Sequence, residues 1–185
     1  MLIEPVWTDA VQQTLFRNIL EATARPGRIV SLENCLGAAS ARTGVLATLV
    51  DGAVTMADPH RLLREEETLF LQSPSAACED ARFILASGTA EPDFTPRAGD
   101  LENPEFGATL VLEVDLLSRD HGPLGLVCTG PGIESEHRLF AAGLSRTWME
   151  RRREWNAYFP MGVDIYLVDE ARVAALPRTT CIRTI

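Results

Sequence analysis

The alternation of apolar and polar residues in the C-terminal quarter of the chain predicts two paired strands. Val163, Ile165 and Leu167 alternate with more polar neighbours, which is the pattern of a strand with one buried face. The polar segment 169–171 is short enough for a turn, and apolar residues resume over 172–176. We therefore interpret this part of the chain as a hairpin that closes a sheet.

The residues that follow this hairpin have two interpretations. Pro177 has no N–H to donate, so it ends the second strand, and three hydrogen-bond donors come directly after it. They are either a solvated polar tail or part of a pocket at the end of the sheet that binds an anion. A glycine-containing loop after another predicted strand could add backbone N–H groups to such a pocket. The candidate residues of this anion site are Arg178, Thr179, Thr180, Gly130 and Gly132.

Elsewhere the apolar pattern changes between a helical period and a strand period. It predicts helices over residues 9–24, 44–50, 59–67, 74–80 and 144–155. It predicts strands over residues 28–32, 53–57, 68–71, 82–86, 108–117 and 123–128, the last two as neighbours. Residues 88–106, rich in proline and charge, are expected to form a long surface loop. Strands mixed with helices throughout indicate an α/β fold, a layered sandwich with a mixed sheet.

Composition narrows the classes of protein. The 185 residues are expected to form a single domain, 1–185. The net charge of −9 argues against nucleic acid and against anionic membranes as partners. No signal peptide or apolar run of membrane-spanning length is visible, and the four cysteines form no C-x-x-C motif, so we expect a cytoplasmic protein with reduced thiols. All 17 basic residues are arginine, so neither a Schiff base with pyridoxal phosphate nor a P-loop lysine is available.

The sequence shows no catalytic set and no metal site. Cys128 ends a predicted strand and could act as a nucleophile with His121 or His137 as its base, but a buried thiol is the favoured interpretation. Glu134, Glu136 and His137 offer metal-ligating atoms, yet they lack a second histidine at helical spacing and are expected to begin a solvated helix. We therefore assign no catalytic residue and no metal ligand.

A basic, tryptophan-containing helix is the candidate surface for partners. The predicted helix 144–155 carries a run of three arginines between two tryptophans. Such a run is usually a solvated face, but tryptophan and arginine are also enriched at the centres of protein interfaces. The candidate partner-binding residues are Trp148, Arg151, Arg152 and Trp155.

Several motifs, in order along nearly the whole chain, resemble one family. The motifs are FRNILEATARPGRIVSL (16–32), GATLVL (107–112), GPGI (130–133), FPMG (159–162) followed by Asp164, and PRTT (177–180). Together they resemble the H subunit of the bacterial carbon–phosphorus lyase system, which handles organophosphonates. The tract 144–154 is more basic than expected for that family.

The resemblance implies a fold similar to the pyridoxal-phosphate transferases without the cofactor, and a self-dimer when isolated. It also implies assembly with the G, I and J subunits of the lyase core, which exchanges the adenine of ATP for an alkylphosphonate. This gives ribose 1-phosphonate 5-triphosphate. In that family this subunit offers no catalytic residue to carry over, so an auxiliary role is expected. The alternatives are a stand-alone dimeric protein that binds phosphate or phosphonate, or a small-molecule enzyme that uses Cys128.

Overall fold

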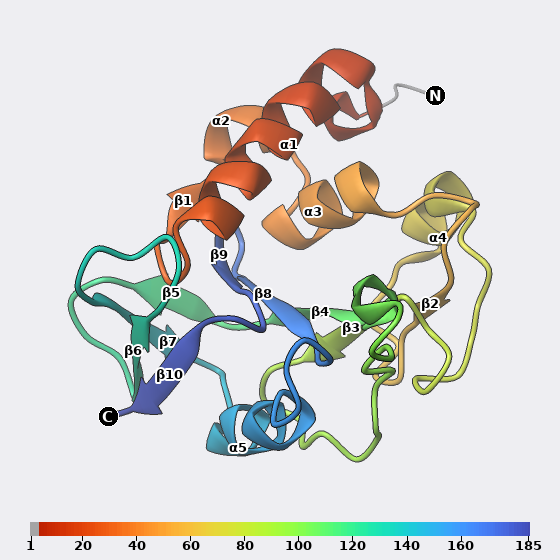
Figure 1. Ribbon diagram of the computed structural model, residues 1–185. Coiled ribbons are helices and arrows are strands. Elements are labelled where there is room, and N and C mark those ends of the chain that lie inside the picture. The colour runs from red at the N-terminus through yellow and green to blue at the C-terminus, as the bar shows by residue number, and fades with distance from the viewer. Residues whose placement is uncertain (1–3) are drawn as a thin grey trace.

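The computed structural model describes residues 4–185, in which most helices lie in the first half of the chain and most strands in the second (Figure 1). The helices are η1 (Pro5–Trp7), α1 (Asp9–Ala24), α2 (Glu33–Leu36), α3 (Ala41–Leu49), α4 (Glu65–Leu71), η2 (Pro104–Phe106) and α5 (Arg146–Trp155), where η marks a 3-10 turn. The strands are β1 (Val30–Ser31), β2 (Met56–Ala57), β3 (Phe83–Ser87), β4 (Thr109–Glu113), β5 (Leu116–Ser118), β6 (Leu124–Thr129), β7 (His137–Ala142), β8 (Asp164–Val168), β9 (Arg172–Leu176) and β10 (Cys181–Thr184).

Six strands form a mixed sheet in the order β1-β9-β8-β4-β3-β2. Strands β2, β3, β4 and β8 are parallel, whereas β9 is antiparallel to both of its neighbours. The hairpin predicted from apolar alternation is confirmed as β8 and β9, with Ile165 opposite Leu176 and Val168 opposite Val173. The α/β class and the mixed sheet are therefore as expected from the sequence.

The two faces of this mixed sheet bury separate hydrophobic cores, because side chains alternate along each strand. On β4, Val111 packs toward α1 and α3, while Leu110 and Leu112 pack on the opposite face. Helices α1, α2 and α3 lie over the first face, and a second sheet with α5 lies below the other (Figure 1). The result is three layers, with the mixed sheet in the middle.

The second sheet was not predicted. It contains four antiparallel strands in the order β10-β6-β7-β5. The expected single strand 108–117 divides because the Val114 N–H donates to the Val168 carbonyl in the mixed sheet, and the Asp115 N–H donates to the Ala142 carbonyl in the second. The expectation that 123–128 neighbours this strand is wrong, since β5 and β6 each pair with β7.

One buried carboxylate joins the two sheets at this crossing. Asp169, 4% exposed, lies in the turn between β8 and β9. Its Oδ2 accepts a hydrogen bond from the Leu117 N–H at 2.8 Å, and its Oδ1 accepts from the N–H groups of Ala171 and Arg172. The Arg172 guanidinium lies 2.7 Å from Oδ2, so charge and hydrogen bonds both compensate the burial of this group.

The predicted helices at the two ends of the chain are confirmed. α1 has the expected bounds and buries Leu15, Ile19 and Ala22, whereas its Phe16 and Leu20 are 50% and 54% exposed. α5 begins after Ser145, whose hydroxyl accepts a hydrogen bond from the Thr147 N–H and so caps the helix. Within residues 4–185, no helix has both the length and the apolar character needed to cross a bilayer.

The polar middle of the chain and one later strand were mispredicted. The segments 59–67 and 74–80 were expected to be helices and 68–71 a strand, whereas one helix, α4, covers 65–71. Its start is fixed because the Glu67 carboxylate accepts a hydrogen bond from the Arg64 N–H at 2.9 Å. The expected helix start near His137 is instead β7, whose buried Leu139 and Ala141 alternate with more exposed residues.

Candidate functional site

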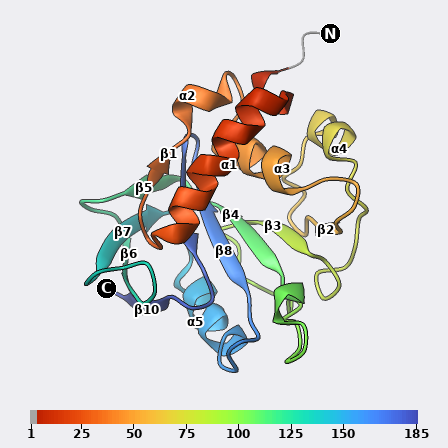
Figure 2. The same cartoon turned by 45° about the horizontal axis from the view of Figure 1, so that its top comes forward.

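Residues from both candidate sets line a groove between α5 and β10. This helix and this strand pack against each other (Figures 1 and 2). The groove encloses about 500 Å³, within the range typical of small-molecule sites. Four arginines and one glutamate line it, so its formal charge is positive although the chain carries −9. The lining residues that matter for its chemistry are Glu150, Arg152, Arg153, Arg178, Thr180 and Arg183.

Arg152 lies at the floor of this groove and is only 5% exposed. Its Nη2 donates to the carbonyl oxygens of Pro177 and Thr180, and so holds the turn between β9 and β10. Burial lowers the pKa of Arg152 to about 10, partly offset by Cys128 and Asp164, and the guanidinium therefore remains charged at neutral pH. Within residues 4–185, no carboxylate lies within ion-pair distance of it.

Arg178 has a different environment from the one that the sequence indicated. Its Nη2 lies 2.7 Å from the Asp164 carboxylate, and its backbone N–H donates to the same carboxylate at 2.7 Å. Its Nη1 donates to the Pro104 carbonyl at 2.6 Å. The guanidinium therefore ties the turn after β9 to β8 and to the end of the long loop. Its donors are already used within the protein, and an anion would have to compete with Asp164 for them.

The two loops of the predicted anion site are adjacent only in part. A Cβ placed on Gly130 would lie 3.0 Å from the Thr179 carbonyl oxygen, and Cys181 pairs with Thr129 in the second sheet. Gly132, however, lies against Ala24 and the turn that follows α1. Thr180 is 3% exposed, and its Oγ1 has no hydrogen-bond partner among residues 4–185.

The tryptophans of the candidate partner-binding surface belong to an aromatic cluster. Trp148 is fully buried, and its Nε1 donates to the Ala90 carbonyl at 2.8 Å. Phe94 stacks on Trp155 and packs edge-on against Trp148. Trp148 and the buried Arg152 therefore cannot act as surface anchors. Trp155 is half-buried, and Arg151 lies 5.7 Å from its ring centroid, so these two residues remain candidates for partner contacts.

Two arginines of the groove were not among the sequence candidates. Arg153 is exposed and lines the groove beside the buried Arg152, whereas the sequence candidates included only Arg151 and Arg152 of the basic run. Arg183 lies in β10, a strand that was not predicted from the sequence. The signal for this strand was the alternation of Ile182 with polar neighbours, but four residues of alternation carry little weight on their own.

The strand register brings Cys128 and His137 together without giving them the features of a nucleophile and its base. The two residues are directly opposite in β6 and β7. The Cys128 thiol is fully buried, and burial raises its pKa to about 11, partly offset by the charge of Arg152. The His137 Nδ1 lies 2.8 Å from the Pro26 carbonyl oxygen. Within residues 4–185, no group of three or more metal-ligating side chains is assembled to hold an ion.

The thiols are expected to differ in reactivity. In the native protein, iodoacetamide should modify the exposed Cys181 first and leave the buried, protonated Cys128 unmodified. Peptide mass spectrometry after a timed reaction measures each site separately, and a denatured sample, in which every thiol reacts, is the control. Preferential modification of native Cys128 would instead support a nucleophilic role for it.

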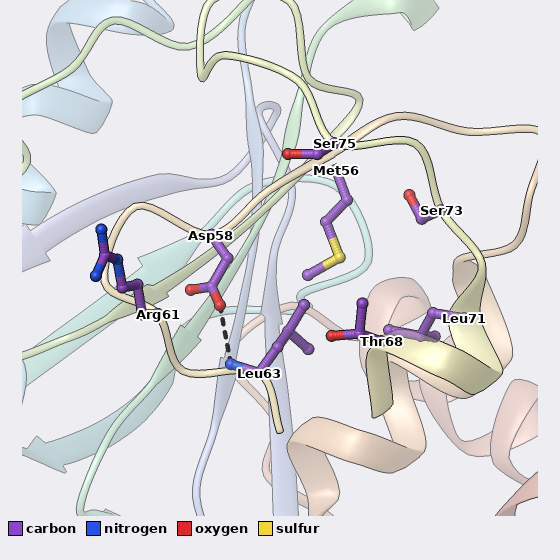
Figure 3. A pocket seen from close by; sticks show the side chains of 8 residues that line it. All are labelled: Met56, Asp58, Arg61, Leu63, Thr68, Leu71, Ser73 and Ser75. Carbon is purple, nitrogen blue, oxygen red and sulfur yellow. Dashed lines mark hydrogen bonds between the residues drawn. The ribbon is translucent and has the colours of Figure 1, made fainter. Parts of the chain in front are cut away.

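A second cavity, of about 310 Å³, lies between the end of β2 and α4 (Figure 3). Its acidic residue, Asp58, accepts hydrogen bonds from the N–H groups of Leu62 and Leu63. Ser73 donates to the Val54 carbonyl at 2.6 Å. Because these polar groups already serve the local loop and Met56 and Leu71 supply apolar walls, we assign no chemistry to this cavity.

This α/β chain matches the model of the family described as bacterial phosphonate metabolism protein (PhnH) over residues 6–183. The chain belongs to this family, and the resemblance drawn from its motifs is confirmed. It is 46% identical over 177 residues to the putative C-P lyase subunit protein HtxG of Stutzerimonas stutzeri, covering 96% of this chain and 88% of the relative. It is 30% identical over 181 residues to the alpha-D-ribose 1-methylphosphonate 5-triphosphate synthase subunit PhnH of Rhizobium meliloti (strain 1021), covering 91% and 88%.

Proposed function

We propose that this chain is a subunit of a carbon–phosphorus lyase complex, required for exchange of the adenine of ATP for an alkylphosphonate. The observation that carries this proposal is the family match over residues 6–183 together with the two relatives named as subunits of such systems. The product of the reaction is ribose 1-phosphonate 5-triphosphate. The proposed location is the cytoplasm.

The proposed role is auxiliary rather than catalytic. The environments of the sequence candidates support this, since the Cys128 thiol is buried and protonated and the Arg178 guanidinium is paired with Asp164. An auxiliary subunit can accelerate a reaction by holding a partner's site in the geometry that catalysis requires. We further propose that the fold is related to the pyridoxal-phosphate transferases and works without their cofactor, which agrees with the absence of lysine from the sequence.

The proposed partners are the G, I and J subunits, with a self-dimer when the chain is isolated. Large apolar side chains that remain exposed support protein contacts, because such groups gain free energy when an interface covers them. Phe16 and Leu20 lie on the outer face of α1, and Tyr158 and Phe159, 75% and 67% exposed, follow α5. Sedimentation of the isolated chain tests the dimer, and co-purification with the neighbouring subunits tests the assembly.

Reconstitution tests the function itself. The partner subunits are assembled with and without this chain, and adenine release from ATP is measured in the presence of methylphosphonate. We expect the complete mixture to release adenine and the mixture without this chain to lose most or all of that activity. This chain alone should release no adenine. Full activity without it would contradict the subunit role, and adenine release by the lone chain would contradict the auxiliary role.

A further inference from the structure

We propose that the groove between α5 and β10 is a binding site for a phosphoryl oxyanion, meaning the tetrahedral group of a phosphate or a phosphonate. Arg152 and Thr180 form its floor, and Arg153 and Arg183 form its rim. This site shares Thr180 with the site indicated by the sequence, but its charge comes from arginines other than Arg178. The inference rests on the groove itself and does not require the proposed complex.

The first argument is the uncompensated charge. Among residues 4–185, no carboxylate lies within ion-pair distance of Arg152, Arg153 or Arg183. Glu150 is the acidic residue of the lining, and Arg178 has its own partner in Asp164. A buried cation is costly unless an anion compensates it. The direct hydrogen bonds of Arg152 within residues 4–185 go to carbonyl oxygens, and Asp164 acts on it only from beyond ion-pair distance, so an external anion fits this position.

A second depression rich in arginine shows the contrast. It lies around the turn after α1 and encloses about 450 Å³. There Arg25 and Arg28 both contact the Glu21 carboxylate, and Arg138 contacts Glu136. Acidic side chains of the chain itself therefore neutralise much of that depression. In the groove between α5 and β10, three of the four arginines have no carboxylate partner among residues 4–185, against one of four, Arg119, in that depression, so the groove is the better place for a foreign anion.

The second argument is the pair of unsatisfied polar atoms. The Arg152 Nε and the Thr180 Oγ1 are both buried and have no hydrogen-bond partner among residues 4–185. Leaving such a group unpaired costs on the order of 1–3 kcal/mol, so an explanation for each is needed. Both can donate a hydrogen bond, and the chemical species that satisfies them is one with several acceptor oxygens close together.

These donors suit a phosphoryl group, whose tetrahedral oxygens offer several acceptors close together. Guanidinium N–H groups match the oxygen spacing of phosphate and phosphonate, and the hydrogen bonds are charge-assisted. The net charge of −9 repels anions at a distance, so binding must come from short contacts within the groove. Two sources provide this group, a simple alkylphosphonate or the polyphosphate chain of a nucleotide, and they differ in the number of linked phosphoryl groups.

Titration calorimetry on the isolated full-length chain tests the proposal. The probes are methylphosphonate, inorganic phosphate and tripolyphosphate, each brought to millimolar concentration. Binding of tripolyphosphate at least about tenfold more tightly than the other two assigns the site to a polyphosphate chain, because each added charged hydrogen bond contributes that much or more. Similar binding of all three assigns it to a single phosphoryl group. No binding of any probe overturns the proposal.

Two double variants locate the binding. Arg153→Gln with Arg183→Gln removes the rim charges. Arg17→Gln with Arg61→Gln removes two other exposed arginines that likewise have no carboxylate partner among residues 4–185. We expect the rim variant to raise the Kd about tenfold or more and the control variant to change it less than about twofold. An equal loss in both variants would show that net charge, and not the groove, attracts the anion, and would overturn the site.

Thr180→Val tests the floor with a readout that separates binding from folding. Because the hydroxyl has no partner, replacing it by a methyl group should leave the free energy of unfolding unchanged or increase it. Binding of the same probe should nevertheless weaken several-fold. In parallel, a bound anion should slow the alkylation of Cys181, which also lines the groove. Unchanged affinity in Thr180→Val and unprotected Cys181 would place the anion elsewhere. Because these assays use the isolated chain, their outcome is separate from that of the reconstitution.

Discussion

Glu67→Gln is expected to lower the free energy of unfolding by about 3–5 kcal/mol at neutral pH. The Glu67 carboxylate is 2% exposed and lies 3.0 Å from the Arg42 guanidinium. It also accepts hydrogen bonds from the Thr43 hydroxyl and the Arg64 N–H. Glutamine removes the charge that compensates Arg42 and converts one oxygen acceptor into a donor. The remaining partner of Arg42, Glu113, is too exposed to replace it fully.

The stability supplied by Glu67 also depends on pH. Burial alone would raise the pKa of this carboxyl, but the Arg64 N–H, the Thr43 hydroxyl and Arg42 together hold its pKa below the usual 4.5. The stabilisation is therefore fully present above this usual value and is lost as the pH falls through the lower pKa of the folded state. In the glutamine variant, this part of the acid dependence should disappear.

Urea unfolding at several pH values measures both effects. Glu66→Gln is the matched control, because Glu66 is the neighbouring glutamate of α4 and is exposed. We expect the control to change the free energy of unfolding by less than about 0.5 kcal/mol. A Glu67 variant as stable as the control would show that the network contributes nothing net to folding.

Trp148→Ala is expected to lower the free energy of unfolding by about 3–5 kcal/mol, the range for removing a buried aromatic side chain. Trp148 is fully buried and contacts Phe94 with ring centroids 6.0 Å apart. Its indole N–H also holds the Ala90 carbonyl at the start of the long loop 88–106. Alanine leaves a cavity in the hydrophobic core that contains Trp148 and removes one hydrogen bond between the loop and α5.

Two measurements separate the packing from the hydrogen bond. Trp148→Phe keeps most of the apolar surface but cannot donate to Ala90, so we expect less than half of the loss of stability. Limited proteolysis should cut the segment 88–106 faster in both variants, because each lacks the hydrogen bond from the Trp148 indole to the Ala90 carbonyl. A loss below about 1 kcal/mol in the alanine variant would show that the site collapses around the cavity.

Local sequence patterns predicted the helices whose apolar positions repeat over several turns and the strands whose apolar positions alternate over several residues. The helix 9–24, the hairpin β8–β9 and the helix that ends at Trp155 were predicted because each buries one face of a regular element. The short segments failed for the opposite reason. Residues 68–71 read equally well as strand or helix, and a side-chain contact, that of Glu67 with the Arg64 N–H, decides the outcome.

The second sheet was missed because long-range pairing defines it. Nothing local in 108–117 shows that the chain leaves one sheet at Val114 and enters another at Asp115. The candidate site was affected in the same way. The sequence indicated that Thr180 lies near a glycine loop. It could not show that Arg178 forms an ion pair with Asp164, or that α5 places Arg152 against the turn between β9 and β10. Charge balance at a site depends on neighbours that only the fold supplies.

The crossing between the sheets has a consequence for cooperativity. Val114, Asp115 and Leu117 donate hydrogen bonds to the mixed sheet, the second sheet and Asp169 respectively, all within four residues of chain. If the hydrogen bonds of either sheet break at this point, the same stretch of backbone is displaced in the other sheet. The Asp169 carboxylate then also loses one of its hydrogen-bond donors. We therefore expect the two sheets to unfold together rather than as independent units.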